Sequence, residues 1–260
     1  MATSSGAAAT RPISDPPPTE AQPICPICKG AGYYTFAVRV GDPNFGVLIT
    51  CECRQAEKER RAMDELRRMS NIEPFASKTF ETFDSTIFGV KRAFARAWEY
   101  ARMPRGWLIL FGQYGCGKTH LAAAIANEAL KRHYRVLFAI VPDLLDHLRS
   151  TFGPNSEVEY DERFEIIRDV PLLILDDLGT ENTTPWAREK LYQIINHRYN
   201  YGLSTVITSN RDPKDIEPRI FSRMRDRTLS EEIILMDADD YRQKSVNDRY
   251  TYRHQRHQER

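Results

Sequence analysis

Three continuous apolar runs recur along the chain, at residues 107–111, 136–140 and 172–175, and a further strand that ends in polar groups is expected at 203–210. Runs of this kind are typical of strands that are buried on both faces of a sheet. Between them, apolar side chains recur every three to four residues, which indicates helices that bury one face. This alternation predicts an α/β fold with a parallel sheet. We expect helices at 87–102, 120–131, 141–152, 163–170 and 186–201, an irregular segment at 153–161 and an edge strand at 233–235.

A small cysteine-containing module is predicted at residues 24–53. Apolar positions in 33–40 and 47–50 flank the turn residues 41–44, which indicates a hairpin. Four thiolates in two close pairs can form a tetrahedral Zn²⁺ site, and a module this small hardly folds without its metal. A redox pair or unrelated buried thiols remain alternatives, because the second pair is Cys-x-Cys rather than Cys-x-x-Cys. The four candidate ligands are Cys25, Cys28, Cys51 and Cys53.

Three segments contain few apolar residues. Residues 1–23 have almost nothing to bury, so we expect a disordered tail. Residues 54–71 are dense in charges of both signs, which favours a solvated linker helix. Residues 243–260 are basic and contain tyrosines; such a tail either contacts nucleic acid or is disordered.

Composition limits the possible functions. A chain of 260 residues with 41% hydrophobic content can hold one full-sized domain and a small appendage. The net charge of +1 gives no general attraction to nucleic acid, so any DNA contact needs a local basic patch. With neither a membrane-spanning apolar stretch nor a signal peptide, we expect a cytoplasmic protein without membrane contact. There the five cysteines stay reduced rather than forming disulfides.

A glycine-rich loop joins the first buried strand to the next helix. Residues 112–119 read GQYGCGKT, with glycines at 112, 115 and 117. Backbone N–H groups of such a loop and the positive end of the helix make an anion site for the phosphates of a nucleotide. Lys118 would bind the β- and γ-phosphates, and the Thr119 hydroxyl would bind Mg²⁺. The alternative is an ordinary glycine-rich turn.

Polar residues end the third and fourth strands of this pattern. Asp176 and Asp177 follow the run 172–175, which places them at the carboxyl edge of the sheet, where α/β proteins bind ligands. Asp176 would hold Mg²⁺ through water and Asp177 would orient the attacking water. Asn210 ends the strand after it and is positioned to help hold that water. An acidic helix cap is the alternative for the aspartates.

Two further features have two interpretations each. Phe80 and Phe83 either pack under a nucleotide base or fill the edge of the core. Residues 219–227 contain four arginines, of which Arg219 and Arg223 lie one helical turn apart. An exposed arginine there could reach the γ-phosphate of a neighbouring subunit. A solvated basic face or a contact with the DNA backbone is the alternative.

Taken together, these motifs resemble those of the bacterial replicative-helicase loaders. These are AAA+ ATPases of the DnaC/DnaI type, which are akin to the IstB-type ATPases of insertion-sequence transposition. The resemblance covers residues 72–242, and some loaders carry a similar cysteine module before a charged helix. It implies a three-layer AAA+ sandwich without a C-terminal helical lid, since little chain follows residue 230. Its markers are LDDLGTE at 175–181, LYQIINHRY at 191–199, ITSN at 207–210 and RIFSRM at 219–224.

The resemblance also implies residue roles. Residues 112–119 match Walker A, with Cys116 and the adjoining His120 among the nucleotide contacts, and 172–177 match Walker B. Asn210 matches sensor 1. The trans-acting arginine finger, its supporting arginine and a further family arginine are matched by Arg223, Arg219 and Arg242. By alignment, Arg149 and Phe152 fall on the path of single-stranded DNA, where an arginine and an aromatic suit phosphate and base. Asp177 departs from the Glu of many AAA+ members, which would slow hydrolysis.

Four functions compete. The first is an ATP-driven loader that forms a ring or spiral, engages single-stranded DNA and binds a hexameric replicative helicase through the zinc module. The second is an ATPase that regulates a transposase. A nucleotide-dependent adaptor that scarcely hydrolyses ATP is the third. A small-molecule kinase is the fourth and is disfavoured, because it has no use for Asn210 or for the pair Arg219 and Arg223. The zinc module favours the first.

Overall fold

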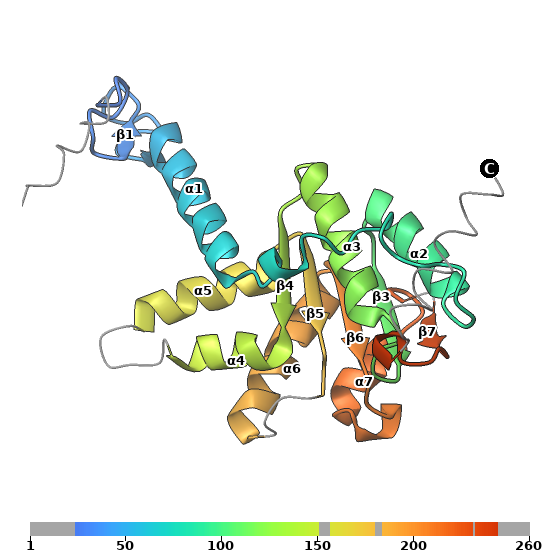
Figure 1. Cartoon of the computed structure of the whole chain (residues 1–260). Helices are drawn as coiled ribbons and strands as arrows, with labels where there is room; N and C mark the ends of the chain where they lie inside the picture. The colour runs from blue at the N-terminus through green and yellow to red at the C-terminus, as the bar shows by residue number, and fades with distance from the viewer. Residues whose placement is uncertain (1–23, 151–156, 180–183, 231, 244–260) are drawn as a thin grey trace, which may run out of the picture. The chain divides into compact units, whose positions relative to one another are not determined.

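A computed structural model describes residues 24–150, 157–179, 184–230 and 232–243 (Figure 1). The chain divides into two compact units, and the border between Glu59 and Arg60 falls inside a helix. The expected tail at 1–23 lies outside the described residues, as do Phe152 and all of the expected tail at 243–260 except Gln243, which ends a single helical turn. Among the described residues, none of the helices has the length and apolar character needed to cross a bilayer.

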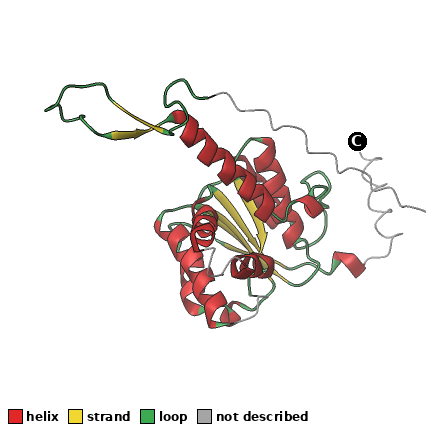
Figure 2. Cartoon of the chain, turned by 90° about the vertical axis from the view of Figure 1, so that its left-hand side faces the viewer, coloured by secondary structure: helices red, strands yellow, loops and turns green. Residues whose placement is uncertain are grey.

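The first unit contains a short antiparallel hairpin (Figure 2). Strands β1 (Tyr33–Thr35) and β2 (Leu48–Thr50) pair with Tyr33 opposite Thr50. The hairpin is shorter than predicted, because residues 38–47 form successive turns instead of a ladder. In these turns Asp42 N–H donates to Arg39 O and Phe45 N–H donates to Asp42 O.

Helix α1 (Glu52–Met69) begins two residues earlier than the predicted linker helix, so it includes Cys53. Cys51 N–H donates to Gly32 O at 2.9 Å, which ties the start of this helix to the turn after the first cysteine pair. Near its other end, Leu66 and Met69 are buried in the core of the second unit. The rest of the helix is polar, as its charge pattern predicts.

The second unit is built on a five-stranded sheet in the order β4-β5-β6-β3-β7. All neighbouring strands are parallel, which confirms the predicted α/β fold. The glycine-rich loop follows β3, a strand flanked by β6 and β7. The strands are β3 (Trp107–Gly112), β4 (Val136–Ile140), β5 (Leu172–Asp176), β6 (Ser204–Ser209) and β7 (Ile233–Met236).

Helices cover both faces of this sheet and complete three layers (Figure 1). Successive side chains of a strand point to opposite faces, so Ile109 and Leu110 of β3 belong to different cores. One core is closed by α2 (Lys91–Arg102) and α3 (Lys118–Lys131). The other is closed by α4 (Val141–Ser150), α5 (Glu157–Asp169), α6 (Pro185–Asn200) and α7 (Pro218–Met224). Single turns occur at η1 (Glu73–Phe75), η2 (Pro213–Asp215) and η3 (Tyr241–Gln243).

Two helices begin elsewhere than the sequence pattern predicts. Helix α2 starts at Lys91 rather than 87, because Gly89 makes a turn with φ of 83° and packs against the carbonyl of Asp237. Helix α5 starts at Glu157, inside the segment expected to be irregular. The rings of Tyr160 and Phe164, one turn apart, stack at 5.8 Å and are buried. That burial stabilises the earlier turn, which its polar composition disfavours.

Candidate nucleotide and metal sites

The glycine-rich loop wraps the start of α3. Gly115 and Gly117 adopt positive φ angles of 74° and 99°, a conformation that side chains with a Cβ rarely take. Lys118 is only 5% exposed, and its Nζ donates to the carbonyls of Gly112 at 2.9 Å and Gln113 at 2.8 Å. The ammonium group is therefore held over the loop, at the positive end of α3.

A cavity of about 880 Å³ opens beside this loop. Its volume falls in the range of small-molecule sites. The wall is made by the loop residues 114–120, by the segment 75–90 that precedes α2, and by Asp177, Tyr241 and Arg242. The cavity therefore unites the loop with segments from both sides of it in the sequence. This is the expected location for a nucleotide, and the assignment of individual contacts stays a prediction.

The two phenylalanines before α2 take different places. Phe83 lines the cavity, stacks on Phe94 with ring centres 5.7 Å apart and meets His120 edge-on. Phe80 instead packs edge-on against Phe94 and Trp98 in the core. Only Phe83 is therefore available to a base in the cavity, while Phe80 fills the core edge.

His120 ties the first turn of α3 to the segment before α2. Its Nε2 lies 3.0 Å from the carbonyl oxygen of Thr79 and 3.2 Å from the hydroxyl of Thr82. Burial lowers the pKa of this imidazole, so the neutral form, which can donate its N–H to the carbonyl, is favoured. Its side chain lines the cavity. The segment 77–84 is thereby held next to the glycine-rich loop.

Asp176 and Asp177 end β5 at the carboxyl edge of the sheet. Asp176 is 2% exposed, and burial raises the pKa of its carboxyl to about 6 in spite of a hydrogen bond from the Thr208 hydroxyl. Thr119 also hydrogen-bonds to this carboxylate, so the residues predicted to share Mg²⁺ lie together. Asp177 lines the cavity and adopts a positive φ of 58°.

Asn210 follows directly after β6. Its Oδ1 is buried and has no hydrogen-bond partner within the described part of the chain. An unpaired buried acceptor is costly, which marks this residue for a ligand or water. Asn210 does not belong to the cavity wall, so its predicted contact with the attacking water remains a prediction.

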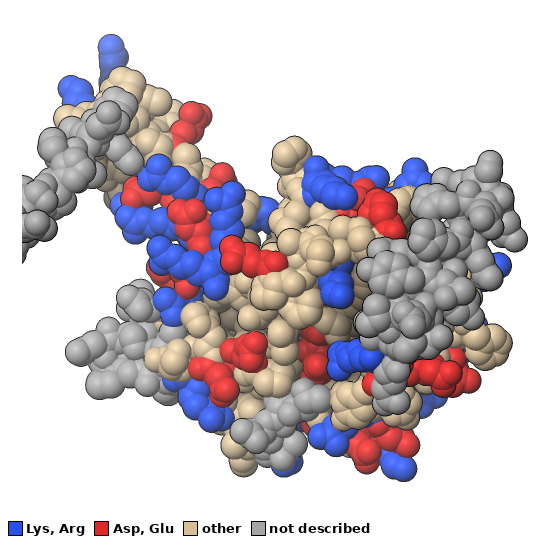
Figure 3. Space-filling view, in the orientation of Figure 1, with Lys and Arg blue, Asp and Glu red and all other residues tan. Residues whose placement is uncertain are grey.

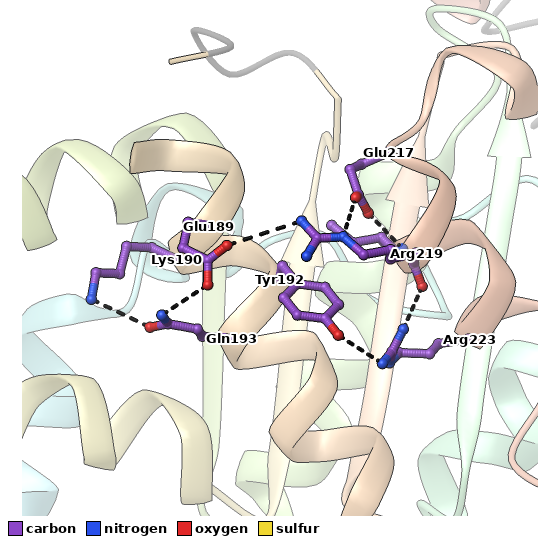
Figure 4. Close-up of polar contacts among 8 residues, drawn as sticks. Glu189, Lys190, Tyr192, Gln193, Glu217, Arg219 and Arg223 are labelled. Atoms are coloured by element: carbon purple, nitrogen blue, oxygen red, sulfur yellow. Dashed lines mark hydrogen bonds and ion pairs between the residues drawn. The ribbon is translucent and has the colours of Figure 1, made fainter. Parts of the chain in front are cut away.

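Arg219 and Arg223 lie on α7 and both contact α6 (Figure 4). The Arg223 guanidinium donates to Tyr192, to Asn196 and to the carbonyl of Arg219. The Arg219 guanidinium lies 4.0 Å from the centre of the Tyr192 ring. Both arginines are therefore ordered by side chains of one neighbouring helix. Sequence reasoning missed this, because nothing local signals a contact between α6 and α7.

Arg149, at the end of α4, lies over the ring of Trp186 at 5.2 Å and donates to the hydroxyl of Thr184. Thr184 caps the start of α6 by accepting from Ala187 N–H. A cation beside a partly exposed aromatic ring suits phosphate and base together. Trp186 is a candidate that sequence reasoning missed, since only the fold brings α4 and α6 together.

Residues after β7 return to the glycine-rich loop. Tyr241 N–H donates to Gly115 O at 3.2 Å, and Arg242 lines the cavity. Asp240 packs so closely on Gly115 that a Cβ there would lie 1.7 Å from its Oδ1. Arg242, matched above to a family arginine without a defined role, therefore stands at the same cavity as Lys118.

The four predicted cysteine ligands form one cluster, with all four sulfur atoms within 4.8 Å of one another. A tetrahedral Zn²⁺ site with Zn–S bonds of about 2.3 Å separates its sulfurs by about 3.8 Å. Cys25 and Cys51 are 3.6 Å apart, and Cys28 and Cys53 are 3.3 Å apart. Hydrogen bonds with the thiols of Cys28 and Cys51, followed by burial, raise the pKa of Cys53 to about 12. The cluster therefore fits zinc in number, chemistry and spacing.

Charges on the surface are mixed. Figure 3 shows Lys and Arg interspersed with Asp and Glu along α1 and over the second unit. This mixture agrees with the net charge of +1. Any nucleic-acid contact must therefore depend on particular arginines rather than on an overall basic surface.

A family model described as IstB-like ATP binding protein matches residues 45–246. The chain belongs to this family. The match spans both the region of the glycine-rich loop and the arginines of α7. Membership makes the chain an ATP-binding protein of the IstB-like family, as its motifs predicted.

Three curated relatives are similar in sequence. DnaC, the replicative helicase loader of Escherichia coli K12, is 28% identical over 202 residues, which are 75% of this chain and 82% of that protein. The replicative helicase loader DnaI of Bacillus subtilis is 25% identical over 171 residues, and the match covers 63% of this chain but only about half (54%) of DnaI. The putative ATP-binding protein of insertion sequence IS5376 from Geobacillus stearothermophilus is 31% identical over 163 residues, 62% of each chain.

Solved structures give the same fold. A crystal structure of the DnaC helicase loader superimposes with a TM-score of 0.55 at 24% identity, covering 64% of this chain and 99% of that one. The crystal structure of DnaI gives 0.52 at 27% identity, covering 64% and 92%. The replication initiator DnaA, bound to AMPPCP and single-stranded DNA, gives 0.53 at 25% identity, covering 63% and 50%. The α/β unit is thus an AAA+ fold, as predicted.

Proposed function

We propose that this protein hydrolyses ATP and uses the reaction to load a replicative DNA helicase onto single-stranded DNA. The observation that carries this proposal is the cluster of four cysteines in a unit of its own ahead of the ATPase unit. A simple transposition ATPase has no use for such a unit, whereas a loader needs a separate part that holds its helicase. The similarity to DnaC over 82% of that loader adds support.

Hydrolysis would take place in the cavity beside the glycine-rich loop. Lys118 would bind the β- and γ-phosphates, and Thr119 with Asp176 would hold Mg²⁺, which neutralises phosphate charge when bound. Asp177 and Asn210 would orient the attacking water. Phe83 and Arg242 also line the cavity.

Self-association into a ring or spiral would complete the site. Arg223 would act on the γ-phosphate of the neighbouring copy, with Arg219 in support. Arg223 stands on α7, and it does not belong to the wall of its own cavity. An arginine that acts between subunits makes hydrolysis depend on assembly, and it would serve as the release switch of the loader.

The other ligands follow from the remaining clusters. The four cysteines would hold Zn²⁺, and the zinc module at 24–53 would bind the hexameric helicase. Single-stranded DNA would contact Arg149 and Phe152, and we add Trp186 because of its stacking contact with Arg149. The linker helix at 54–71 would join this module to the ATPase domain at 72–242. Such a loader would act in the cytoplasm, away from membranes.

Regulation of a transposase is the second candidate function. The description of the family model and the similarity to the ATP-binding protein of IS5376 support it. The ATPase residues are shared between the two functions, so they do not discriminate. The partner does.

Co-purification tests the proposal. The full chain is mixed with ATP and either the hexameric replicative helicase of its organism or an insertion-sequence transposase, and complexes are separated by size. We expect a complex with the helicase that is lost in Cys25→Ser but retained in Lys118→Ala. A complex with the transposase alone would overturn helicase loading in favour of the second function. ATPase activity that single-stranded DNA leaves unchanged would contradict the DNA part of the proposal.

A further inference from the structure

The stretch LYQIINHRY at 191–199 is a family marker whose residues have no role in the proposed reaction. It lies in α6, and Tyr192 of this stretch bonds to Arg223 of α7 (Figure 4). Tyr192 and Asn196 bond to Arg223, and the ring of Tyr199 lies 5.5 Å from the same guanidinium. The one-turn spacing of Tyr192 and Asn196 places both on a single helix face. This face holds α7 through its arginines.

Arg223 is fixed by several contacts at once. Its Nε and Nη2 donate to Asn196 Oδ1 at 3.0 and 2.5 Å, and Nη2 also donates to the Tyr192 hydroxyl at 2.9 Å. Its Nη1 donates to the backbone carbonyl of Arg219 at 2.8 Å. A free arginine side chain has about 2 kcal/mol of rotamer entropy to lose on binding. These contacts remove most of that freedom before any ligand arrives.

The acceptors around Arg223 are all uncharged. They are an amide oxygen, a phenol hydroxyl and a backbone carbonyl, and within the described residues no carboxylate forms an ion pair with this side chain. Arg219 differs, because its Nε donates to Glu217 at 2.6 Å and its Nη2 lies 4.0 Å from Glu189. The charge of Arg219 is therefore offset within the subunit. The charge of Arg223 is held in place but not neutralised.

We infer that Tyr192 and Asn196 are positioning residues that hold Arg223, oriented and with its charge uncompensated, for the γ-phosphate of a nucleotide bound to a neighbouring copy. This rests on the proposed trans role of Arg223. The ring of Tyr192 also packs against both guanidinium groups, with Arg219 4.0 Å and Arg223 4.8 Å from its centre. The function of the LYQIINHRY stretch would then be to orient the arginine finger.

Asn196→Asp separates this role from a structural one. The substitution keeps an oxygen acceptor in place but sets a carboxylate against Arg223. We expect ATPase activity at saturating protein concentration to fall at least about tenfold, towards the level of Arg223→Ala, while the melting temperature stays the same or rises. Gln193→Glu is the matched control: it adds the same charge on α6, at a residue that bonds to Lys190 and Glu189 rather than to Arg223. Unchanged activity in Asn196→Asp would overturn the inference.

Tyr192→Phe probes the hydroxyl alone. It keeps the ring that packs against Arg219 and removes one of the hydrogen bonds to Arg223. We expect kcat to fall severalfold with the KM for ATP unchanged, since the subunit's own nucleotide cavity is intact. A rise in KM with normal kcat would contradict positioning between subunits.

Mixed oligomers distinguish the failure of this inference from the failure of the proposed function. Arg223→Ala subunits bind ATP but lack the finger, and Lys118→Ala subunits supply the finger but cannot use ATP. We expect the mixture to regain activity, and to fail to regain it when the Lys118→Ala subunit also carries Asn196→Asp. If neither mixture regains activity, the trans role in the proposed function is wrong. If both do, Arg223 acts in trans and the positioning role is wrong.

Discussion

Thr208 on β6 donates its hydroxyl to the carboxylate of Asp176 on β5 at 2.7 Å. The same hydroxyl accepts the backbone N–H of Asp177 at 3.0 Å. One side chain thus orders both carboxylate residues at the edge of the sheet. Neither strand could predict this contact, because it exists only after β5 and β6 pair in register.

Replacing Thr208 by Val should therefore damage the site more than the fold. It removes one hydrogen bond to the buried Asp176 carboxylate and one from the backbone N–H of Asp177, which together cost about 1–3 kcal/mol of unfolding free energy. We expect a loss in this range by urea unfolding, together with weaker Mg²⁺-dependent nucleotide binding by calorimetry. Thr208→Ser keeps the hydroxyl and should retain both. Equal nucleotide affinity in the Val and Ser variants would contradict the role assigned to this hydroxyl.

The raised pKa of Asp176 predicts a pH dependence with a definite sign. Its carboxyl titrates near 6 in the fold but near 4 when unfolded, so between these values the folded state holds the extra proton. Stability from this group is therefore lost as pH rises through 6, and the loss at pH 8 is about 3 kcal/mol. Asp176→Asn should be more stable than the native chain at pH 8, and the difference should shrink by pH 5. Urea unfolding at both pH values measures it; a constant difference would contradict the prediction.

Nucleotide binding should change in the opposite direction. Only the ionised carboxylate of Asp176 attracts Mg²⁺, so Mg²⁺-ATP affinity should fall severalfold as pH drops from 7.5 to 5.5. Affinity for ATP in the presence of a chelator should change much less over the same range. Fluorescent-nucleotide titrations with and without Mg²⁺ provide the comparison. Parallel curves would argue against Asp176 as a cation ligand.

Removing one cysteine should release the metal without destroying the ATPase unit. Cys28→Ser leaves three sulfurs, so we expect less than one tenth of the zinc per chain and rapid proteolysis within residues 24–53. Basal ATPase should persist, because the AAA+ unit has its own core. Cys116→Ala is the control: it removes a thiol of the glycine-rich loop, so this variant should keep its zinc. Full zinc in Cys28→Ser by atomic emission would refute the site.

Gly115→Ala tests the packing of the last described residues on the loop. The new Cβ would lie 1.7 Å from Asp240 Oδ1 and 2.9 Å from its Cα, so the segment carrying Arg242 must move. We expect ATP affinity to fall at least about tenfold, on top of about 1 kcal/mol of backbone strain. Gly46→Ala is the matched control, since Gly46 has a φ of 76° but open space around it. Normal affinity in Gly115→Ala would show that the contact with Asp240 is dispensable.

Trp186→Ala should weaken binding of single-stranded DNA by about tenfold, because a stacked base contributes about 1–3 kcal/mol. Arg149→Ala should weaken binding and also reduce its salt dependence, as expected for a phosphate contact. Tyr201→Ala, beyond the other end of α6 and 71% exposed, serves as the control. Fluorescence anisotropy with an oligonucleotide at several salt concentrations measures all three. Wild-type affinity in both variants would remove this surface from the proposal.

The fold was predictable because its signals are local. Buried parallel strands read as continuous apolar runs, and the glycine-rich loop lies between a strand and a helix in sequence as in space. The start of α5 was not predictable, since the stacking of Tyr160 on Phe164 and their burial outweigh a polar composition. Turns replace part of the predicted hairpin because backbone hydrogen bonds within residues 38–47 favour them over a longer strand ladder.

The residue types of the candidate site follow from the sequence. Most of the contacts that hold these residues do not. Lys118, Asp177 and Arg242 do share one cavity. No local pattern predicts that Tyr192 and Asn196 bond to Arg223, or that Arg149 stacks on Trp186. Each such pair joins elements distant in sequence, and their proximity depends on how whole helices pack on the sheet.

Strand β3 pairs on one side with β6 and on the other with the edge strand β7, which comes last of these five strands in the sequence. During synthesis, the glycine-rich loop therefore emerges from the ribosome long before either neighbour of its strand exists. A nascent chain that stops short of residue 236 has the nucleotide motif but lacks one edge of the sheet beneath it. Competence to bind ATP should thus arise only after β7 has been synthesised and has paired with β3, so shorter nascent chains should not join a nucleotide-dependent assembly.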